Sequence, residues 1–129
     1  MVLQVVRLGT PRLAGEGTRI GTVRRPPRGV PKAQFAAQNW YDVWFPTLAP
    51  SNALMKLGQA ADTPAEWTAF VKKYKSEMAA PEAAHAIRLL ASLSKTGHFS
   101  VGCYCADEAH CHRAILKALL RENGAEVDE

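Results

Sequence analysis

The chain has 129 residues, 47% of them apolar and 22% charged, and a formal net charge of +4 at pH 7. This composition is ordinary for one globular domain, so we expect residues 1–129 to form a single domain, and the lack of any run of about 20 apolar residues excludes a membrane helix. The three cysteines make an odd count and no basic stretch precedes the first apolar residues, so we expect a reduced, cytoplasmic protein without a membrane partner.

Positive charge is concentrated in the first third of the chain. Residues 1–41 hold seven basic side chains against one acidic side chain, a net charge of +6, while residues 42–129 carry a net charge of −2. Six of the seven bases are arginines, whose planar guanidinium groups suit phosphate groups better than lysine does. Two interpretations stay open: a solvated basic rim, or a surface that binds phosphate, a nucleotide or nucleic acid.

Two short segments near the N-terminus, 2–8 and 19–23, have the composition of β-strands. The next segment, Arg24–Gly29, contains two prolines, which fix φ and remove amide donors. We therefore expect a stiff loop that displays its arginines, and we predict that Arg24 and Arg28 bind an anionic group. The alternative is a rigid connector whose arginines face solvent.

The segment Trp40–Phe45 is dense in aromatic residues and forms either a buried strand or a short helix. Asp42 is its one charged residue. Because carboxylates are rarely buried without a partner, we expect Asp42 to pair with an arginine of the N-terminal segment. The pair is either structural or orients an arginine at a binding site. Exposed apolar side chains in this segment would instead favour an interaction surface.

Helices are predicted in the middle of the chain. Ser51 is a natural N-cap for the first. The second begins with a capping box, Thr63 to Glu66, and has proline at its first position. The second and third helices each have one apolar face, formed by Trp67, Phe70, Val71, Tyr74 and Met78 in the second and by Ala83, Ile87, Leu90 and Ala91 in the third.

A further strand is predicted at Phe99–Cys103, because its apolar residues alternate with small or polar ones. The order strand, strand, helices, strand, helix indicates a compact α/β sandwich with a parallel or mixed sheet. In open sheets of this kind, sites lie at the carboxyl ends of the strands. Cys103 and Cys105 are therefore expected at such a site.

The last helix is predicted to begin after an N-cap at Asp107 and to end near Asn123. Its apolar face places His112 on the inward side at the N-terminal end. We therefore expect His112 to point toward the cysteines at the end of the preceding strand. The same helical geometry places Arg113 near the rim.

The cysteine- and histidine-rich turn between this strand and this helix has three possible roles. One is a tetrahedral metal site, although its spacing is not a usual zinc pattern. A second is a thiolate nucleophile, with His112 as base and Arg113 holding an anionic substrate. The third is structural, with small buried cysteines and a hydrogen-bonded histidine. The metal ligands would be Cys103, Cys105, Cys111 and either His112 or His110.

Four stretches of the chain are similar to motifs of one known family. Gly17–Gly29 resembles G-T-R-V-L-V-D-R-L-W-P-R-G, Asp42–Ser51 resembles D-x-W followed by A-P-S, Trp67–Glu77 resembles F-x-x-x-Y-x-x-E, and Cys103–Arg113 resembles C-A-E-K-D-P-E-H-C-H-R. Together they resemble the bacterial and archaeal family called domain of unknown function 488. The chain departs from these motifs at three positions, with Val23 in place of Asp, Pro26 in place of Trp and Cys105 in place of Glu.

The resemblance implies a small three-layer, Rossmann-like α/β sandwich with a mostly parallel sheet and helices on both faces, and it brings no established reaction. The matched residues coincide with those that the sequence pattern singles out. We predict Cys103, Cys111 and His112 as catalytic residues and assign no metal ligand. The predicted ligand-binding residues are Arg24, Arg28, Asp42, Ser51 and Arg113.

These residues predict a basic pocket that binds a phosphate- or nucleotide-like anion near a Cys/His cluster. One alternative is a nucleic-acid-binding module without catalysis, which no helix-turn-helix, zinc-finger or RNA-recognition signature supports. Another is a structural zinc site of the Cys3His type. The sequence specifies no cofactor and no oligomeric state, and it leaves open whether the domain is an enzyme.

Overall fold

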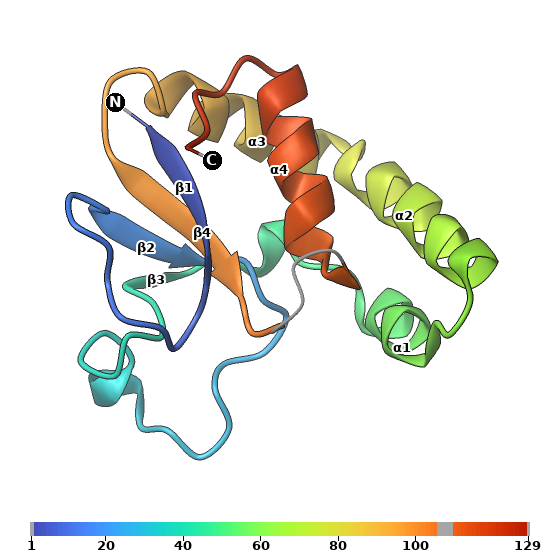
Figure 1. Cartoon of the computed structure of the whole chain (residues 1–129), viewed down its shortest axis with the longest axis horizontal. Helices are drawn as coiled ribbons and strands as arrows, with labels where there is room; N and C mark the ends of the chain where they lie inside the picture. The colour runs from blue at the N-terminus through green and yellow to red at the C-terminus, as the bar shows by residue number, and fades with distance from the viewer. Residues whose placement is uncertain (1, 106–109, 129) are drawn as a thin grey trace.

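The computed structural model describes residues 2–105 and 110–128. In these residues four strands form one parallel sheet, in the spatial order β1 (Leu3–Arg7), β4 (Phe99–Cys103), β2 (Thr18–Gly21) and β3 (Val43–Trp44). The α-helices are α1 (Asn52–Ala60), α2 (Pro64–Met78), α3 (Pro81–Leu93) and α4 (His112–Glu122), and two 3-10 helices are η1 (Lys32–Gln34) and η2 (Pro46–Leu48). Figure 1 shows this arrangement.

Strand β4 is buried along its whole length and pairs with β1 on one side and β2 on the other. Its register places Cys103 opposite Arg7 of β1 and Gly102 opposite Gly21 of β2. Because all pairings are parallel, the carboxyl ends of these strands meet at one edge of the sheet. This edge is where the sequence predicts the site.

One face of the sheet shares a core with the long helices, and Figure 1 shows α3 and α4 nearer to the strands than α2. Phe99 and Val101 of β4 share a core with residues of these helices. The predicted apolar faces are confirmed: Phe70, Tyr74 and Met78 of α2 are buried, and so are Ala83, Ile87, Leu90 and Ala91 of α3. Burial of these side chains is the main force that holds the helices on the sheet.

The opposite face of the sheet is covered by loop segments that contact Arg19 of β2. Arg19 of β2 is fully buried here, and its guanidinium group donates hydrogen bonds to the backbone oxygens of Thr10 and Asn39 at 2.8 Å each. The loops are thereby fixed to the sheet. The expected α/β class with a small parallel sheet is confirmed.

Two helix N-termini have the caps that the sequence predicts. The Ser51 hydroxyl accepts a hydrogen bond from the Leu54 N–H at 3.3 Å at the start of α1. The Thr63 hydroxyl accepts one from the Glu66 N–H at 3.1 Å at the start of α2. Such bonds satisfy amide donors that have no partner within the helix.

Three local expectations are corrected. The aromatic segment contains only the two-residue strand β3, whose Val43 and Trp44 are 47% and 44% exposed instead of buried. Helix α4 begins at His112 with Cys111 as its N-cap residue, and the expected cap, Asp107, lies outside the described residues. Arg113 is buried, with 5% of its surface exposed, and does not lie at a solvated rim.

None of the helices in the described part of the chain combines the length and the apolar character needed to cross a bilayer.

Candidate functional site

A cluster of two cysteines and one histidine lies where β4 ends and α4 begins. Cys103 is the last residue of β4, Cys111 is the N-cap residue of α4, and His112 is the first residue of that helix. Their sulfur and ring nitrogen atoms all lie within 4.8 Å of one another, and all three side chains are buried. The expectation that His112 points toward Cys103 is therefore confirmed.

The ring of His112 is held in one orientation. Its Nε2 lies 2.8 Å from the backbone oxygen of Thr22. Since a carbonyl oxygen only accepts hydrogen bonds, Nε2 carries the proton and Nδ1 keeps its lone pair. Nδ1 lies 3.9 Å from the sulfur of Cys111. Burial lowers the pKa of His112 to about 4, so the imidazole is neutral at pH 7.

The sulfur atoms of Cys103 and Cys111 are in direct contact. The Cα atoms of the two residues are 7.9 Å apart, whereas cysteines joined by a disulfide usually have Cα atoms about 4.4–6.8 Å apart. The third cysteine, Cys105, is exposed, and it lines a cavity of about 230 Å³ together with Cys103 and His112. His110 is exposed and packs edge-on against Trp67, with ring centres 5.2 Å apart.

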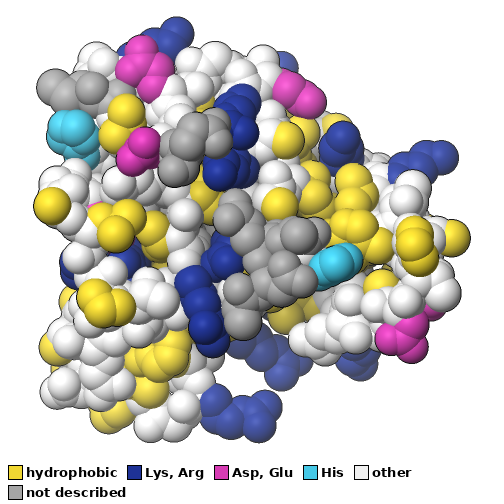
Figure 2. All heavy atoms as spheres, in the orientation of Figure 1, with side chains coloured by type: hydrophobic (Ala, Val, Ile, Leu, Met, Phe, Trp, Pro, Cys, Tyr) yellow, Lys and Arg dark blue, Asp and Glu magenta, His cyan; other side chains and the backbone are white. Residues whose placement is uncertain are grey.

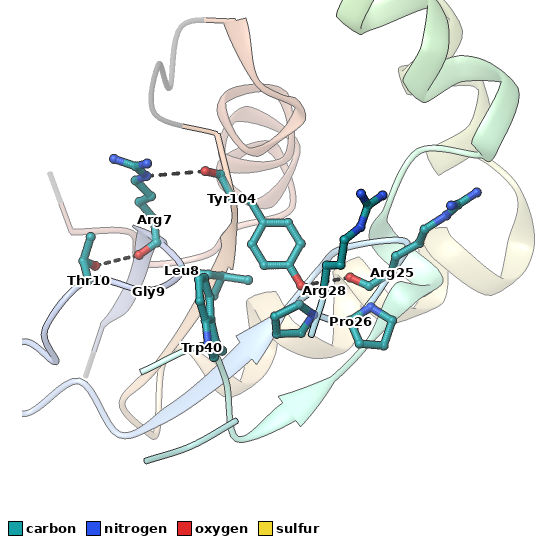
Figure 3. A pocket seen from close by; sticks show the side chains of 10 residues that line it. Arg7, Leu8, Gly9, Thr10, Arg25, Pro26, Arg28, Trp40 and Tyr104 are labelled. Atoms are coloured by element: carbon teal, nitrogen blue, oxygen red, sulfur yellow. Dashed lines mark hydrogen bonds between the residues drawn. The ribbon is translucent and has the colours of Figure 1, made fainter. Parts of the chain in front are cut away.

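A larger cavity, of about 590 Å³, lies next to the cluster and is called the arginine cavity below. Figure 3 shows that Arg25 and Arg28 extend in the same direction, while Arg7 extends from the other side of Tyr104. Among the described residues that line this cavity there is no Asp or Glu. Its lining residues are Arg7, Leu8, Gly9, Thr10, Arg25, Pro26, Pro27, Arg28, Trp40 and Tyr104.

Tyr104 organises one wall of the arginine cavity. Its hydroxyl donates a hydrogen bond to the backbone oxygen of Arg25 at 2.8 Å, and its own backbone oxygen accepts one from Arg7 Nε at 3.4 Å. Its ring packs edge-on against Trp40, with ring centres 5.9 Å apart. Arg25 and Tyr104 line both this cavity and the smaller one beside His112, so the two spaces adjoin. In Figure 2, Lys and Arg side chains, drawn in dark blue, gather over the lower middle of the face that the figure shows.

The predicted binding residues do not all line one cavity. Arg28 lines the arginine cavity, and Arg24 lines the smaller cavity beside His112. The guanidinium group of Arg24 also donates hydrogen bonds to the backbone oxygens of Ala49 and Pro50, at 3.0 and 3.1 Å. Arg24 therefore fixes the end of β2 to the segment before α1 while it borders the cluster.

Asp42 and Ser51 have structural partners. The carboxylate of Asp42 accepts two hydrogen bonds from Arg12, at 2.6 and 3.0 Å, and this interaction lowers the pKa of Asp42. The expected pairing of Asp42 with an N-terminal arginine is thus confirmed. The backbone N–H and the hydroxyl of Ser51 both donate to the carboxylate of Glu77, at 2.9 and 2.6 Å.

Arg113 follows His112 in α4 and, like Arg19, is buried. Within the described part of the chain, its Nε and Nη1 are buried and have no hydrogen-bond partner. A buried charge without a partner costs free energy. The Nε and Nη1 groups of Arg113 are therefore donors that no described residue accepts from.

Of the charged and aromatic residues that line the arginine cavity, only Arg28 was among the predicted site residues, and four were not: Arg7, Arg25, Trp40 and Tyr104. Two of them carried a usable signal. Arg7 ends the first strand and Tyr104 follows the last one, so the rule that sites lie at the carboxyl ends of parallel strands applies to both. Trp40 and Arg25 reach the cavity through loops, whose paths a sequence pattern does not give.

The fold and the site together define a small α/β protein. Its sheet is parallel, and a Cys/His cluster lies at the carboxyl ends of the strands. A family model described as the active DUF488-N3 subclade, DUF488-N3a, matches residues 3–124. The chain therefore belongs to the domain of unknown function 488 (DUF488) family, as its motifs indicate. Comparison with curated proteins and with solved structures gives no match.

Proposed function

We propose that the arginine cavity binds a small phosphate-bearing ligand, preferably a nucleotide, and that the adjoining Cys/His cluster acts on it. The observation that carries this proposal is the lining of the cavity, which combines Arg7, Arg25 and Arg28 with the rings of Trp40 and Tyr104. Guanidinium groups donate paired hydrogen bonds to phosphate, and aromatic rings stack on nucleobases. A nucleotide is the small ligand that uses both features.

The size and availability of the cavity support this proposal. Its volume of about 590 Å³ lies within the range of about 300–1,000 Å³ usual for small-molecule sites. Among the described residues, the side chains of Arg25 and Arg28 have no hydrogen-bond acceptor or acidic partner. Their charges are therefore available to a ligand.

The position of the cavity supports a role for Cys103, Cys111 and His112. A ligand held by Arg25 would extend past Tyr104 toward the smaller cavity that Cys103 and His112 line. Arg113, whose buried Nε and Nη1 have no hydrogen-bond partner among the described residues, adds a positive charge near the same cluster. The matching family model is described as an active subclade, which fits a reactive cluster. We also propose that the protein is cytoplasmic, where Cys103 and Cys111 would be kept as reduced thiols.

The test is a titration calorimetry series on the reduced full chain with AMP, ATP and inorganic phosphate. We expect ATP to bind most tightly, and Arg25→Ala and Arg28→Ala each to weaken binding about tenfold or more, because a hydrogen bond to a charged group contributes about 1.5–3 kcal/mol. Arg88→Ala, an exposed arginine on α3, is the matched control and should change the affinity little.

Equal losses in Arg88→Ala and Arg28→Ala would contradict a specific cavity and indicate general attraction to positive charge. Binding of inorganic phosphate with the same affinity as AMP would contradict the role of the aromatic rings. In that case Trp40→Leu should also leave AMP affinity unchanged, whereas stacking on the base predicts a loss of about 1–3 kcal/mol.

A further inference from the structure

We propose that Cys103, Cys111 and His112 form a binding site for one zinc-type divalent metal ion, with an open coordination position that faces the cavity lined by Cys105. The inference rests on the geometry of this cluster and does not require that the arginine cavity bind a nucleotide. It assigns a chemical role to the cluster, because a three-ligand zinc site leaves one position for water or substrate.

The donor atoms are of the right kind, and the sulfur of Cys111 and Nδ1 of His112 have the right spacing, whereas the sulfurs of Cys103 and Cys111 must separate to bond to one ion. Thiolate sulfur and imidazole nitrogen are the preferred ligands of zinc. With bonds of about 2.0–2.3 Å, two ligands of one tetrahedral zinc ion lie about 3.5–4 Å apart. The sulfur of Cys111 and Nδ1 of His112 are 3.9 Å apart, and the three donor atoms all lie within 4.8 Å of one another.

The ring of His112 is oriented for coordination through Nδ1. A histidine that binds a metal through one nitrogen usually donates its other N–H to a carboxylate or a backbone carbonyl. The Nε2 of His112 makes this bond to the backbone oxygen of Thr22 at 2.8 Å. The lone pair of Nδ1 is thus directed toward the sulfurs.

A shared metal ion fits the backbone positions of the two cysteines better than a disulfide does. Their Cα atoms are 7.9 Å apart, and bridging two cysteines more than about 7 Å apart requires movement of the backbone. An ion bonded to both sulfurs spans a longer gap, since two metal–sulfur bonds replace one sulfur–sulfur bond. The observed separation leaves room for the sulfurs to move apart and bond to one ion.

The fourth position is assigned to the cavity and not to Cys105. Structural zinc sites are closed by four protein ligands, whereas catalytic sites keep one position accessible. Cys105 is exposed, unlike the three buried residues of the cluster, and it lies on the wall of the cavity of about 230 Å³ that Cys103 and His112 border. Arg24 and Arg25 line the same cavity, so an anionic group could approach the ion from there.

The experiment titrates the reduced, metal-free full chain with Co²⁺ as a spectroscopic substitute for zinc. We expect one Co²⁺ per chain, the absorption bands of tetrahedral cobalt, and a thiolate-to-cobalt band with the intensity of two thiolates. Cys103→Ser and Cys111→Ser should each lower the affinity by more than about 100-fold, because even residues that only support a ligand contribute about 10–100-fold. His85→Gln, an exposed histidine on α3, is the control and should bind like the wild type.

Cys105→Ser separates an open site from a closed one. The proposal expects its cobalt affinity to stay within a few-fold of the wild type, and a loss as large as that of Cys103→Ser overturns the open position. Absence of cobalt binding by the folded, reduced wild type overturns the metal site. If circular dichroism shows that a serine variant is unfolded, the thiolate-to-cobalt band of the wild type still tests whether the cysteines bind the ion. Absence of this band at full cobalt occupancy overturns the proposal.

Discussion

Glu16 and Arg19 form a buried ion pair on the face of the sheet that the loops cover. The guanidinium group of Arg19 donates to the Glu16 carboxylate at 2.7 and 2.9 Å, and the Ser100 hydroxyl donates to it at 2.6 Å. Arg19 also fixes the backbone of Thr10 and Asn39, which adjoin the arginine cavity. One pair of charges therefore connects the sheet to the loops that shape the cavity.

This pair predicts a pH-dependent stability. Burial alone would raise the pKa of Glu16, but the hydrogen bonds from Arg19, Ser100 and the Leu13 N–H lower it from 4.5 to about 2. Because the pKa is lower in the folded state, the carboxylate stabilises the fold above pH 4.5, and this contribution is lost as the pH falls toward 2. The shift corresponds to about 3 kcal/mol at neutral pH.

We therefore expect Glu16→Gln to lower the free energy of unfolding by about 3 kcal/mol at pH 7 and by progressively less toward pH 2. Urea unfolding at a series of pH values measures this difference. Glu82→Gln, an exposed glutamate at the start of α3, is the control, with an expected change below about 0.5 kcal/mol. A difference between the wild type and Glu16→Gln that does not vary with pH would contradict the assignment.

Individual residues differ in how well the sequence predicts their role. Arg19 belongs to the basic N-terminal segment by composition, yet it is buried and paired. The available signal was its spacing, three residues after Glu16, the one acid among residues 1–41. Arg113 was expected near the rim because helical geometry turns it away from the apolar face of the last helix. Since α4 begins at His112, Arg113 lies in its first turn, close to the strand ends.

At the scale of elements, Ser51 joins two helices. Its hydroxyl caps α1 by accepting from the Leu54 N–H, and it donates to Glu77 of α2 at 2.6 Å. The Ser51 N–H donates to the same carboxylate at 2.9 Å. Ser51 therefore fixes the start of α1 against the C-terminal end of α2, and its removal should loosen both.

We expect Ser51→Ala to lower the free energy of unfolding by about 2 kcal/mol, because it removes both an N-cap and a hydrogen bond to a carboxylate. Thr63→Ala removes only a cap and should cost about 1 kcal/mol. Urea unfolding measures both values. ATP affinity of the Ser51→Ala variant tests its predicted role in binding: we expect no change, since Glu77 and Leu54 occupy the hydroxyl, and a tenfold loss would assign Ser51 to the ligand site.

The elements that the sequence predicts well are those with local signals. A capping motif and a periodic apolar face are both contained within one helix, so the sequence pattern alone predicts α2 and α3. Strand β3 has no such signal, because two residues are too few for a period and its side chains are half exposed. Its pairing with β2 depends on the path of the preceding loop, which is a tertiary property.

At the scale of the whole molecule, the sheet topology determines which predictions succeed. The cluster of Cys103, Cys111 and His112 was predictable because one strand and the helix that follows it supply all three residues. The arginine cavity was not, because its walls come from β1, two loops and the end of β4. Those segments meet only after β4 inserts between β1 and β2.

The distribution of charge over the folded chain yields the last prediction. Of the six arginines in residues 1–41, three lie outside the arginine cavity and have structural partners: Arg12 binds Asp42, Arg19 binds Glu16, and Arg24 binds two backbone oxygens. The other three line the arginine cavity, namely Arg7, Arg25 and Arg28. Half of the arginines of residues 1–41 are thus gathered at the arginine cavity.

If single-stranded nucleic acid binds only in the arginine cavity, three arginines set an upper limit to how steeply its affinity falls with salt. Each neutralised phosphate contributes about −0.7 to the slope of log affinity against log salt, so these residues predict a slope no steeper than about −2, and Arg28→Ala should reduce it by about 0.7. Fluorescence anisotropy of a labelled oligonucleotide at several salt concentrations measures the slope. A slope of about −4 or steeper would require a footprint beyond the cavity and would favour the nucleic-acid-binding module over a nucleotide site. A slope near −2 that Arg28→Ala reduces, together with tighter binding of ATP than of AMP, places ligand recognition in the cavity itself.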